Sequence, residues 1–338
     1  MKEAMLWKAL GDSRVQCELC AHACVISAGK KGRCWVRENV SGRLVTHTYG
    51  RLIAAHADPI EKKPLFHFFP SSLSYSIATP GCNFTCKHCQ NADISQMPRE
   101  RGVVQGEFVA PEAIVEYALA HRCRSISYTY TEPTIFFEYA YEVALIAHQR
   151  GLKNVFVTNG FMSERALEKL KGILDAANVD LKAFSEDFYR DICGGRLEPV
   201  KRTIIKMREE GIWVEVTTLI IPGHNDDPSE WEAIADFLVS VDRAIPWHIS
   251  AFYPTYHLTD APPTSPELLQ RARDVGMSKG LKFVYTGNMP GDKGENTFCP
   301  TCGREVIHRR GFSIRENLLD KGACPFCKTP LEGSWEEC

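Results

Sequence analysis

The chain lacks a charge imbalance, a long apolar run and a recognisable export signal. Its 338 residues include 40 Lys and Arg against 42 Asp and Glu, which leaves a formal net charge of −2. This near-neutral balance gives no general attraction to nucleic acid or to acidic membranes. No apolar run approaches the ~20 residues of a membrane-spanning helix, and residues 1–7 have no signal-peptide core. We therefore expect a cytoplasmic protein with no nucleic-acid and no membrane partner.

Long repeats and low-complexity tracts are also missing, and the composition divides the chain into three parts. Residues 1–70 are rich in cysteine, residues 71–289 alternate strands with helices, and residues 290–338 carry two cysteine pairs after a Gly- and Pro-rich linker. We predict an N-terminal Cys-rich segment with a metal site, a barrel domain and a zinc-ribbon-like C-terminal domain.

Cysteine is the residue that the chain has in excess, with 14 copies. They cluster at Cys17, Cys20, Cys24 and Cys34, at Cys82, Cys86 and Cys89, and at Cys299, Cys302, Cys324 and Cys327. Clustered thiols in a long chain without an export signal indicate metal ligands rather than disulfides. Of the isolated cysteines, Cys123 and Cys193 should be buried small hydrophobic residues, and Cys338 should be a thiol at a frayed terminus.

Short β-rich runs alternate with helical stretches from residue 74 onward. The runs end at Pro, Gly, Asn or Asp, and they cover residues 74–79, 125–130, 154–158, 178–182, 213–221, 247–252 and 281–286. The helical stretches cover residues 111–121, 135–150, 163–170, 228–241 and 265–279. This alternation predicts an α/β fold, a partial or full (β/α) TIM-like barrel. Chemistry in such barrels takes place at the carboxyl ends of the strands.

Cys82, Cys86 and Cys89 form a C-x3-C-x2-C loop directly after the first predicted strand. Three thiolates can hold three irons of a [4Fe-4S] cluster and leave the fourth iron open, whereas an electron-transfer cluster has four cysteine ligands. The alternative is a structural zinc site, which would lack one of its four ligands. Because an open iron can bind a substrate or cofactor, the loop predicts catalytic chemistry.

In its place after a first barrel strand, this loop resembles that of the radical S-adenosylmethionine (SAM) enzymes, and the resemblance extends over residues 74–289. It implies a [4Fe-4S] cluster on the three cysteines, SAM chelated to the open iron, and an external electron donor of ferredoxin or flavodoxin type. One electron would cleave SAM to methionine and a 5′-deoxyadenosyl radical, which abstracts hydrogen from a substrate. His88 stands where the family has an aromatic residue that contacts the adenine.

The end of the second predicted strand, residues 129–133, resembles the Gly-Gly-Glu-Pro of the same enzymes. The resemblance implies that Thr131 and Glu132 hold the amino group of SAM, the carboxylate through a charge-assisted hydrogen bond. Tyr130 and Thr131 replace the two glycines, which leaves the backbone contact open. The alternative for Glu132 is a carboxylate on a solvated loop.

Three further strand ends resemble the pyruvate formate-lyase activating enzymes. Thr158 and Asn159 belong to a Thr-Asn-Gly, Asp180 and Lys182 to an Asp-Leu-Lys, and Thr217 to the fifth strand. In that group these strand ends surround SAM and a peptide substrate, so the resemblance implies that the five residues bind cofactor. The alternative for Asp180 and Lys182 is a buried ion pair that stabilises the barrel.

The resemblance is closer still to the radical SAM member of the AmmeMemoRadiSam gene system, and it runs nearly end to end. The motifs that carry it are residues 17–24, 89–91, 130–133, 252–256 and 285–288, together with the C-terminal cysteine pairs. This resemblance implies a Memo-like protein as a partner. It names no substrate.

Cys299, Cys302, Cys324 and Cys327 have the spacing C-x2-C-x21-C-x2-C. Two such pairs are typical of the knuckles of a zinc ribbon, in which four thiolates close a tetrahedral site. So short a segment needs a metal to fold. An iron–sulfur or rubredoxin-type iron site is the alternative. Arg309 and its basic neighbours should form a solvated face rather than a nucleic-acid patch.

Cys17, Cys20, Cys24 and Cys34 could bind zinc or an auxiliary [4Fe-4S] cluster, and His22 could replace one ligand. Spacing does not choose between these geometries, and unligated structural thiols are a third interpretation.

The leading functional hypothesis is a radical SAM enzyme that acts on an unknown substrate. Within that class, a glycyl-radical-enzyme activase of the pyruvate formate-lyase type is an alternative. Two alternatives come from other classes. One is a metal-stabilised module that binds nucleic acid or protein, although the net charge of −2 does not support nucleic-acid binding. The other is an electron-transfer protein that carries clusters alone.

Overall fold

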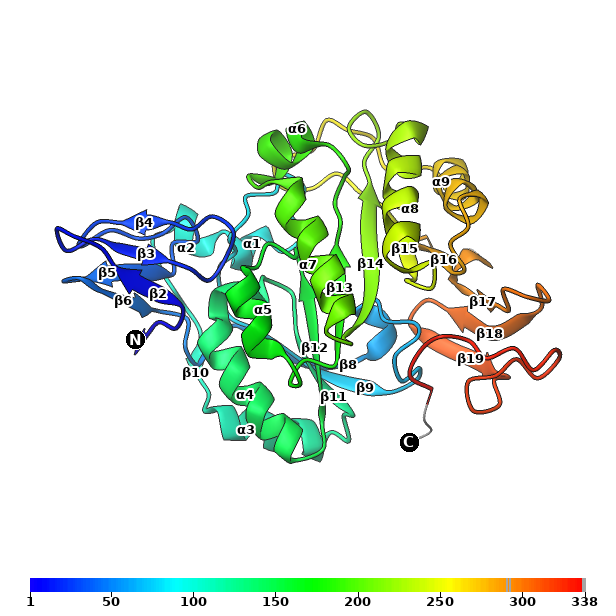
Figure 1. Ribbon diagram of the computed structural model, residues 1–338, viewed down its shortest axis with the longest axis horizontal. Coiled ribbons are helices and arrows are strands. Elements are labelled where there is room, and N and C mark those ends of the chain that lie inside the picture. Colours follow the sequence, from blue (N-terminus) through cyan, green and yellow to red (C-terminus); the bar gives the residue numbers. More distant parts are fainter. Residues whose placement is uncertain (290, 292, 336–338) are drawn as a thin grey trace.

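An eight-stranded sheet forms the centre of the computed structural model, which describes residues 1–289, 291 and 293–335 (Figure 1). Its strands are β8 (Ala54–Pro59), β9 (Leu73–Ala78), β11 (Ser125–Tyr128), β12 (Lys153–Thr158), β13 (Ala176–Asp180), β14 (Trp213–Ile220), β15 (Trp247–Ala251) and β16 (Val284–Gly287). From β9 to β16 the neighbours follow chain order and run parallel, while β8 pairs antiparallel with β9. Within the described residues, β8 and β16 each have one hydrogen-bonded neighbour, so the sheet is an open, partial barrel.

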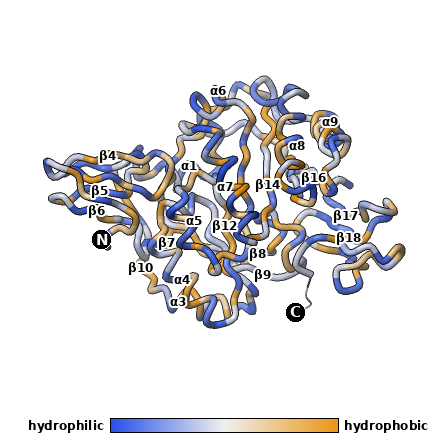
Figure 2. The backbone as a smooth tube through the Cα atoms, in the orientation of Figure 1, coloured by the Kyte–Doolittle hydropathy of each residue, from blue (hydrophilic) through white to orange (hydrophobic). Residues whose placement is uncertain are grey.

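Helices connect the parallel strands and cover the outer face of the sheet (Figure 1). They are α1 (Ala92–Ser95), α2 (Met97–Glu100), α3 (Pro111–Ala120), η2 (Pro133–Phe136), α4 (Phe137–Gln149), α5 (Glu164–Leu170), α6 (Glu186–Phe188), the π-helical turn η3 (Tyr189–Cys193), α7 (Leu197–Glu209), α8 (Pro228–Asp242) and α9 (Pro266–Ser278). Along α3 and α4, hydrophobic and hydrophilic residues are interleaved, as Figure 2 shows, and the buried ones face the sheet. None of the helices in the described part of the chain has the length and apolar character of a membrane span.

The predicted strands and helices of the barrel are confirmed, and the boundaries follow local chemistry. Ser163 caps α5 by accepting a hydrogen bond from the Ala166 amide, and Ser265 caps α9 through the Leu268 amide. The helix α7 was not predicted, although its apolar residues recur at helical spacing and bury Val200.

Small antiparallel sheets make up the N-terminal segment at one end of the molecule (Figure 1). The strands of this segment are β1 (Lys2–Glu3), β2 (Trp7–Ala9), β3 (Val15–Cys17), β4 (Val25–Ile26), β5 (Arg37–Val40), β6 (Arg43–Thr46) and β7 (Arg51–Leu52). The strand β10 (Glu107–Phe108) comes from the connection between α2 and α3 and pairs with β7. They pair in the orders β1-β6-β5, β2-β3-β4 and β10-β7. The segment then continues into β8 and the 3-10 turn η1 (Ile60–Lys62), so its last residues belong to the barrel sheet. The division at residue 70 stays a prediction.

A buried ion pair fastens the N-terminal segment to the barrel. Arg37 of β5 and Glu138 of α4 are each 1% exposed and form an ion pair, and the carboxylate also accepts a hydrogen bond from the Met5 amide at 2.6 Å. Arg37→Met should lower the free energy of unfolding by about 3–5 kcal/mol, because it leaves a buried carboxylate without its cation. Denaturant unfolding followed by circular dichroism would measure this.

The matched control for this prediction is Arg150→Met. Arg150 pairs with Glu116, but both side chains are exposed, at 47% and 61%. This substitution should cost less than about 1 kcal/mol. Equal losses in the two variants would show that burial does not decide the strength of the Arg37 pair.

Three strands form the C-terminal segment at the opposite end of the molecule: β17 (Thr297–Phe298), β18 (Glu305–Arg310) and β19 (Ser313–Asn317), after the 3-10 turn η4 (Lys293–Glu295). The segment packs on the barrel through a hydrophobic cluster that includes Phe66 and Tyr285. The expectation that Arg309 lies on a solvated face was wrong. Its guanidinium is buried, stacks 4.2 Å above the Phe66 ring and donates to the Phe66 carbonyl at 3.0 Å. Cys338 lies outside the described residues.

Candidate functional site

A cavity of about 600 Å³ lies at the carboxyl ends of the parallel strands. Its wall contains the predicted cysteine triplet, Cys82, Cys86 and Cys89. It also contains all eight predicted cofactor-binding residues, His88, Thr131, Glu132, Thr158, Asn159, Asp180, Lys182 and Thr217. The fold therefore brings together side chains from five strands or the loops that follow them, as the position of chemistry in such barrels predicts.

The cysteine loop that follows β9 is fixed by backbone contacts. Gly81, immediately before the first cysteine, has a φ of +112°, a conformation that favours glycine. Farther along, the Thr85 amide donates to the Cys193 carbonyl at 2.8 Å and the Lys87 amide to the Ile192 carbonyl at 3.0 Å. The loop therefore rests against the π-helical turn η3, which carries both carbonyls.

The three thiols of the triplet are too far apart to form a single-ion group. The sulfur atoms of Cys82, Cys86 and Cys89 do not all lie within 4.8 Å of one another, in contrast to groups that could hold a single ion. In a [4Fe-4S] cluster each thiolate binds its own iron. Three separated thiols facing one open cavity fit such a cluster, together with a molecule bound beside it.

Glu132 is the centre of a buried hydrogen-bond network at the end of β11. Its carboxylate accepts hydrogen bonds from the Thr134 amide and hydroxyl at 3.0 and 2.6 Å, from the Thr158 hydroxyl at 2.7 Å and from the Asn159 amide at 2.8 Å. Burial nevertheless raises the pKa of this carboxyl. The network contradicts the alternative of a solvated loop and aligns the ends of β11 and β12. A cation in the cavity would favour the ionised form.

The two residues that replace the expected glycines keep a glycine-like turn. Tyr130 has a φ of +61°, which non-glycine residues seldom adopt. Its carbonyl accepts a hydrogen bond from the Asn91 amide group at 2.8 Å, and its hydroxyl donates to Asp58. The Thr131 hydroxyl donates to the Thr79 carbonyl at 2.7 Å. These contacts hold the strand end in place against the start of the cysteine loop without the glycines.

Asp180 and Lys182 form an ion pair in the cavity wall, with Nζ and Oδ2 2.9 Å apart. Burial alone would lower the pKa of Lys182, but Asp180 and the thiols of Cys86 and Cys193 raise it well above its usual value. The side chains of Asp180 and Lys182 are 35% and 16% exposed, so the pair is not sealed inside the barrel. The pair has no net charge, but its Lys182 ammonium interacts electrostatically with the Cys86 thiol of the triplet.

His88 is buried beside the triplet, and its Nδ1 has no hydrogen-bond partner within the described residues. Burial, with Lys182 and His224 nearby, lowers the pKa of His88 to about 3. Its ring is therefore neutral and has an unused polar atom near the cavity. Cys193 is buried, as predicted. It also lies close to Cys86 and His88, and the potential ligand atoms of the three residues are all within 4.8 Å of one another. No local sequence pattern indicated this proximity.

Several cavity residues have no signal in the local sequence patterns. His248 on β15 bonds the Glu215 carboxylate at 2.6 Å, and that carboxylate also accepts from the amides of Phe66 and His67. Burial alone would raise the pKa of Glu215, but His248 and these contacts lower it. The available indication was a single charged residue, Glu215, in the strand β14. Phe312, at the turn between β18 and β19, lines the cavity from the C-terminal segment.

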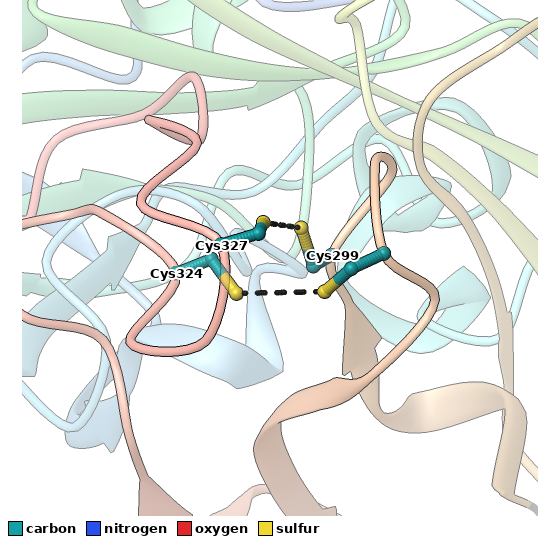
Figure 3. Close-up of side chains that lie close together, drawn as sticks. Cys299, Cys324 and Cys327 are labelled. Carbon is teal, nitrogen blue, oxygen red and sulfur yellow. Dashed lines mark hydrogen bonds between the residues drawn. The ribbon is translucent and has the colours of Figure 1, made fainter.

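The four C-terminal cysteines converge on one point. Figure 3 shows the sulfur atoms of Cys299, Cys324 and Cys327 pointing toward one another. The sulfur atoms of Cys299 and Cys327 are 3.5 Å apart, and those of Cys302 and Cys324 are 3.7 Å apart. Hydrogen bonds from Thr329 lower the pKa of Cys327 to about 6. The four thiols can hold one metal ion.

The four N-terminal cysteines also share a cavity, a small one that is separate from the first. It is lined by Cys17, Cys20, Cys24 and Cys34 and by Asn83 of the cysteine loop. Burial and the neighbouring thiols raise the pKa of Cys34 to about 11. The two cavities therefore meet at the loop that carries the cysteine triplet.

Comparison with known proteins places these features in a family. The radical SAM superfamily model matches residues 76–238. The chain is 45% identical to an uncharacterised protein of Methanocaldococcus jannaschii over 98% of this chain and 99% of that protein. It is 28% identical to the benzylsuccinate synthase activating enzyme of Thauera aromatica, over 32% of this chain and 33% of that enzyme.

A solved structure has the same fold. SuiB of Streptococcus suis, bound to precursor peptide SuiA, matches 68% of this chain and 51% of its own with a TM-score of 0.51 and 14% identity. The superfamily match spans the cysteine loop and the ends of β11, β12, β13 and β14 that line the cavity, and the chain is an enzyme of the radical SAM superfamily.

Proposed function

We propose that Cys82, Cys86 and Cys89 hold a [4Fe-4S] cluster and that SAM binds beside it in the 600 Å³ cavity. The observation that carries this proposal is the convergence of the triplet and all eight predicted cofactor-binding residues on that one cavity. A bound cluster supplies one electron for the cleavage of SAM to methionine and a 5′-deoxyadenosyl radical, which abstracts hydrogen from a substrate.

The protein's residues bind and orient the cofactor. Glu132, held by its neighbours at the ends of β11 and β12, offers a carboxylate to the ammonium group of SAM. Lys182, held by Asp180, offers a cation to a carboxylate. His88 offers an uncharged ring and a free nitrogen to the adenine. Phe312 of the C-terminal segment also lines this cavity.

Glu132→Gln tests the assigned contact with SAM. A hydrogen bond to a charged group contributes about 1.5–3 kcal/mol, so the variant should bind SAM about 10- to 100-fold more weakly. Calorimetry on the reconstituted protein would measure the dissociation constant. Glu116→Gln, at an exposed carboxylate outside the cavity wall, is the control and should bind SAM as the wild type does. An unchanged affinity in a folded Glu132→Gln protein would refute the assignment.

A glycyl-radical-enzyme activase is the second candidate, supported by the similarity to the benzylsuccinate synthase activating enzyme. The motif set from residues 17–24 to 285–288 supports a finer assignment to the AmmeMemoRadiSam system. We accordingly propose a Memo-like partner and a ferredoxin- or flavodoxin-type electron donor. Co-purification with a Memo-like protein under anaerobic conditions would favour the finer assignment over an activase.

We also propose that the C-terminal segment is a zinc-binding domain. Tetrahedral thiolates at Zn–S distances of about 2.3 Å lie about 3.8 Å from one another, close to the 3.5 and 3.7 Å between the paired sulfur atoms. The site would be structural, because all four positions are filled by protein ligands.

A further inference from the structure

The N-terminal cysteine group has no part in the proposed SAM site. Cys17, Cys20, Cys24 and Cys34 line one small cavity. These thiols are close enough to influence one another electrostatically. Cys20 interacts with the other three, and Cys34 interacts with Cys17 and Cys24. The four cysteines are buried or partly buried, and four thiols that line one small cavity offer the ligand set of a metal or iron–sulfur site.

The separation of the sulfur atoms distinguishes two kinds of metal site in this chain. In the C-terminal group all four sulfur atoms lie within 4.8 Å of one another, as ligands of one ion must. No three sulfur atoms of the N-terminal group, all of which the structure describes, come that close. The sulfur atoms of the triplet at Cys82, Cys86 and Cys89 likewise do not all lie within 4.8 Å of one another. The N-terminal thiols are therefore placed to bind different metal ions of one cluster.

Neighbouring residues restrict the ligands to the four thiols. His22 bonds the Asn83 carbonyl through Nε2 at 2.9 Å, and its Nδ1 lies 3.3 Å from the Arg33 guanidinium. Both ring nitrogens are engaged, so His22 need not replace a cysteine. The buried guanidinium of Arg37 donates to the Cys17 sulfur at 3.6 Å. A cation at this position offsets the negative charge of four thiolates.

We propose that Cys17, Cys20, Cys24 and Cys34 bind a second [4Fe-4S] cluster, one with a thiolate on every iron and no open position. Each thiol would lose its proton on binding iron. The cluster would lie against the loop of the first site, since Asn83 lines this cavity and directly follows Cys82. The wider spacing argues against a single zinc ion here, the alternative that the sequence left open.

The test uses a full-length variant in which Cys82, Cys86 and Cys89 are all changed to alanine. After anaerobic reconstitution with iron and sulfide, it should retain about four iron and four sulfide ions per chain, against about eight of each in the wild type. Electron paramagnetic resonance after reduction should detect the remaining cluster. Iron and sulfide contents are measured without SAM cleavage. The test of the second cluster is therefore independent of whether the proposed function is correct.

The reciprocal variant, with Cys17, Cys20, Cys24 and Cys34 changed to alanine, should lose about four iron and four sulfide ions. Cys123→Ala, which removes a buried cysteine outside every cluster, should lose none. If the reciprocal variant does not fold, the first variant still decides the matter. In the first variant, a second zinc ion beyond the one proposed for the C-terminal cysteines, iron without sulfide, or no iron at all would overturn the proposal.

Discussion

Cys82→Ala is expected to lower the formation of 5′-deoxyadenosine from SAM and reductant by at least about 10³-fold, since residues that act as a unit lose most of their effect when one is removed. The three thiolates are the only protein ligands that the proposed cluster has. In the structure the Cys82 sulfur also accepts a hydrogen bond from the Phe84 amide at 3.4 Å and lies 3.8 Å from the Asn159 side-chain amide. Chromatography of the nucleoside products would measure the loss.

The control for this prediction is Cys123→Ala. Cys123 is buried beyond α3 and lies outside the cavity and the groups that could hold a metal. Its loss should leave 5′-deoxyadenosine formation and iron content unchanged. Wild-type activity in Cys82→Ala, with its fold intact, would show that the triplet does not hold the catalytic cluster.

Loss of the zinc ion that we propose for the C-terminal cysteines is expected to have the largest effect on stability. Zinc binding to such sites contributes about 10 kcal/mol or more, and the small sheet β17-β18-β19 has a hydrophobic core that includes Val306, Ile307 and Leu331. Chelation of zinc, or Cys324→Ser, should therefore unfold this segment and expose the buried Arg309. Hydrogen exchange over residues 297–331, with metal analysis, would follow the change.

Ser313→Ala is the matched control in the same segment, because Ser313 is exposed at the start of β19 and lies outside the cysteine group. It should retain one zinc ion per chain and the slow exchange of the wild type. Slow exchange in a metal-free Cys324→Ser protein would mean that the segment is held by its contacts with the barrel alone.

The barrel and the cofactor side of the cavity could be predicted from the sequence because their patterns are local. Each strand is a short β-rich run ended by a turn residue, and the side chains that follow the runs necessarily meet at the carboxyl edge. That rule alone predicts that Glu132, Asn159 and Asp180 lie together, and all three line the cavity. Tyr130 stands where the related enzymes have glycine, yet its backbone adopts the left-handed conformation that glycine favours. Hydrogen bonds to Asn91 and Asp58 hold Tyr130 in that conformation.

The features that could not be predicted depend on contacts between distant parts of the chain. Glu215 meets His248 on the neighbouring strand and the amides of residues 66 and 67. Arg309 is buried because Phe66, far away in sequence, covers its guanidinium. The proximity of Cys193 to Cys86 follows from the turn η3 that supports the cysteine loop. None of these pairs has a spacing that marks it in the sequence.

The most direct test of the central claim is the reaction of the anaerobically reconstituted wild-type protein with SAM and a strong one-electron reductant. We expect 5′-deoxyadenosine and methionine to form together in equal amounts, and neither to form without reductant. Tight iron binding to a protein that leaves SAM intact under these conditions would contradict it.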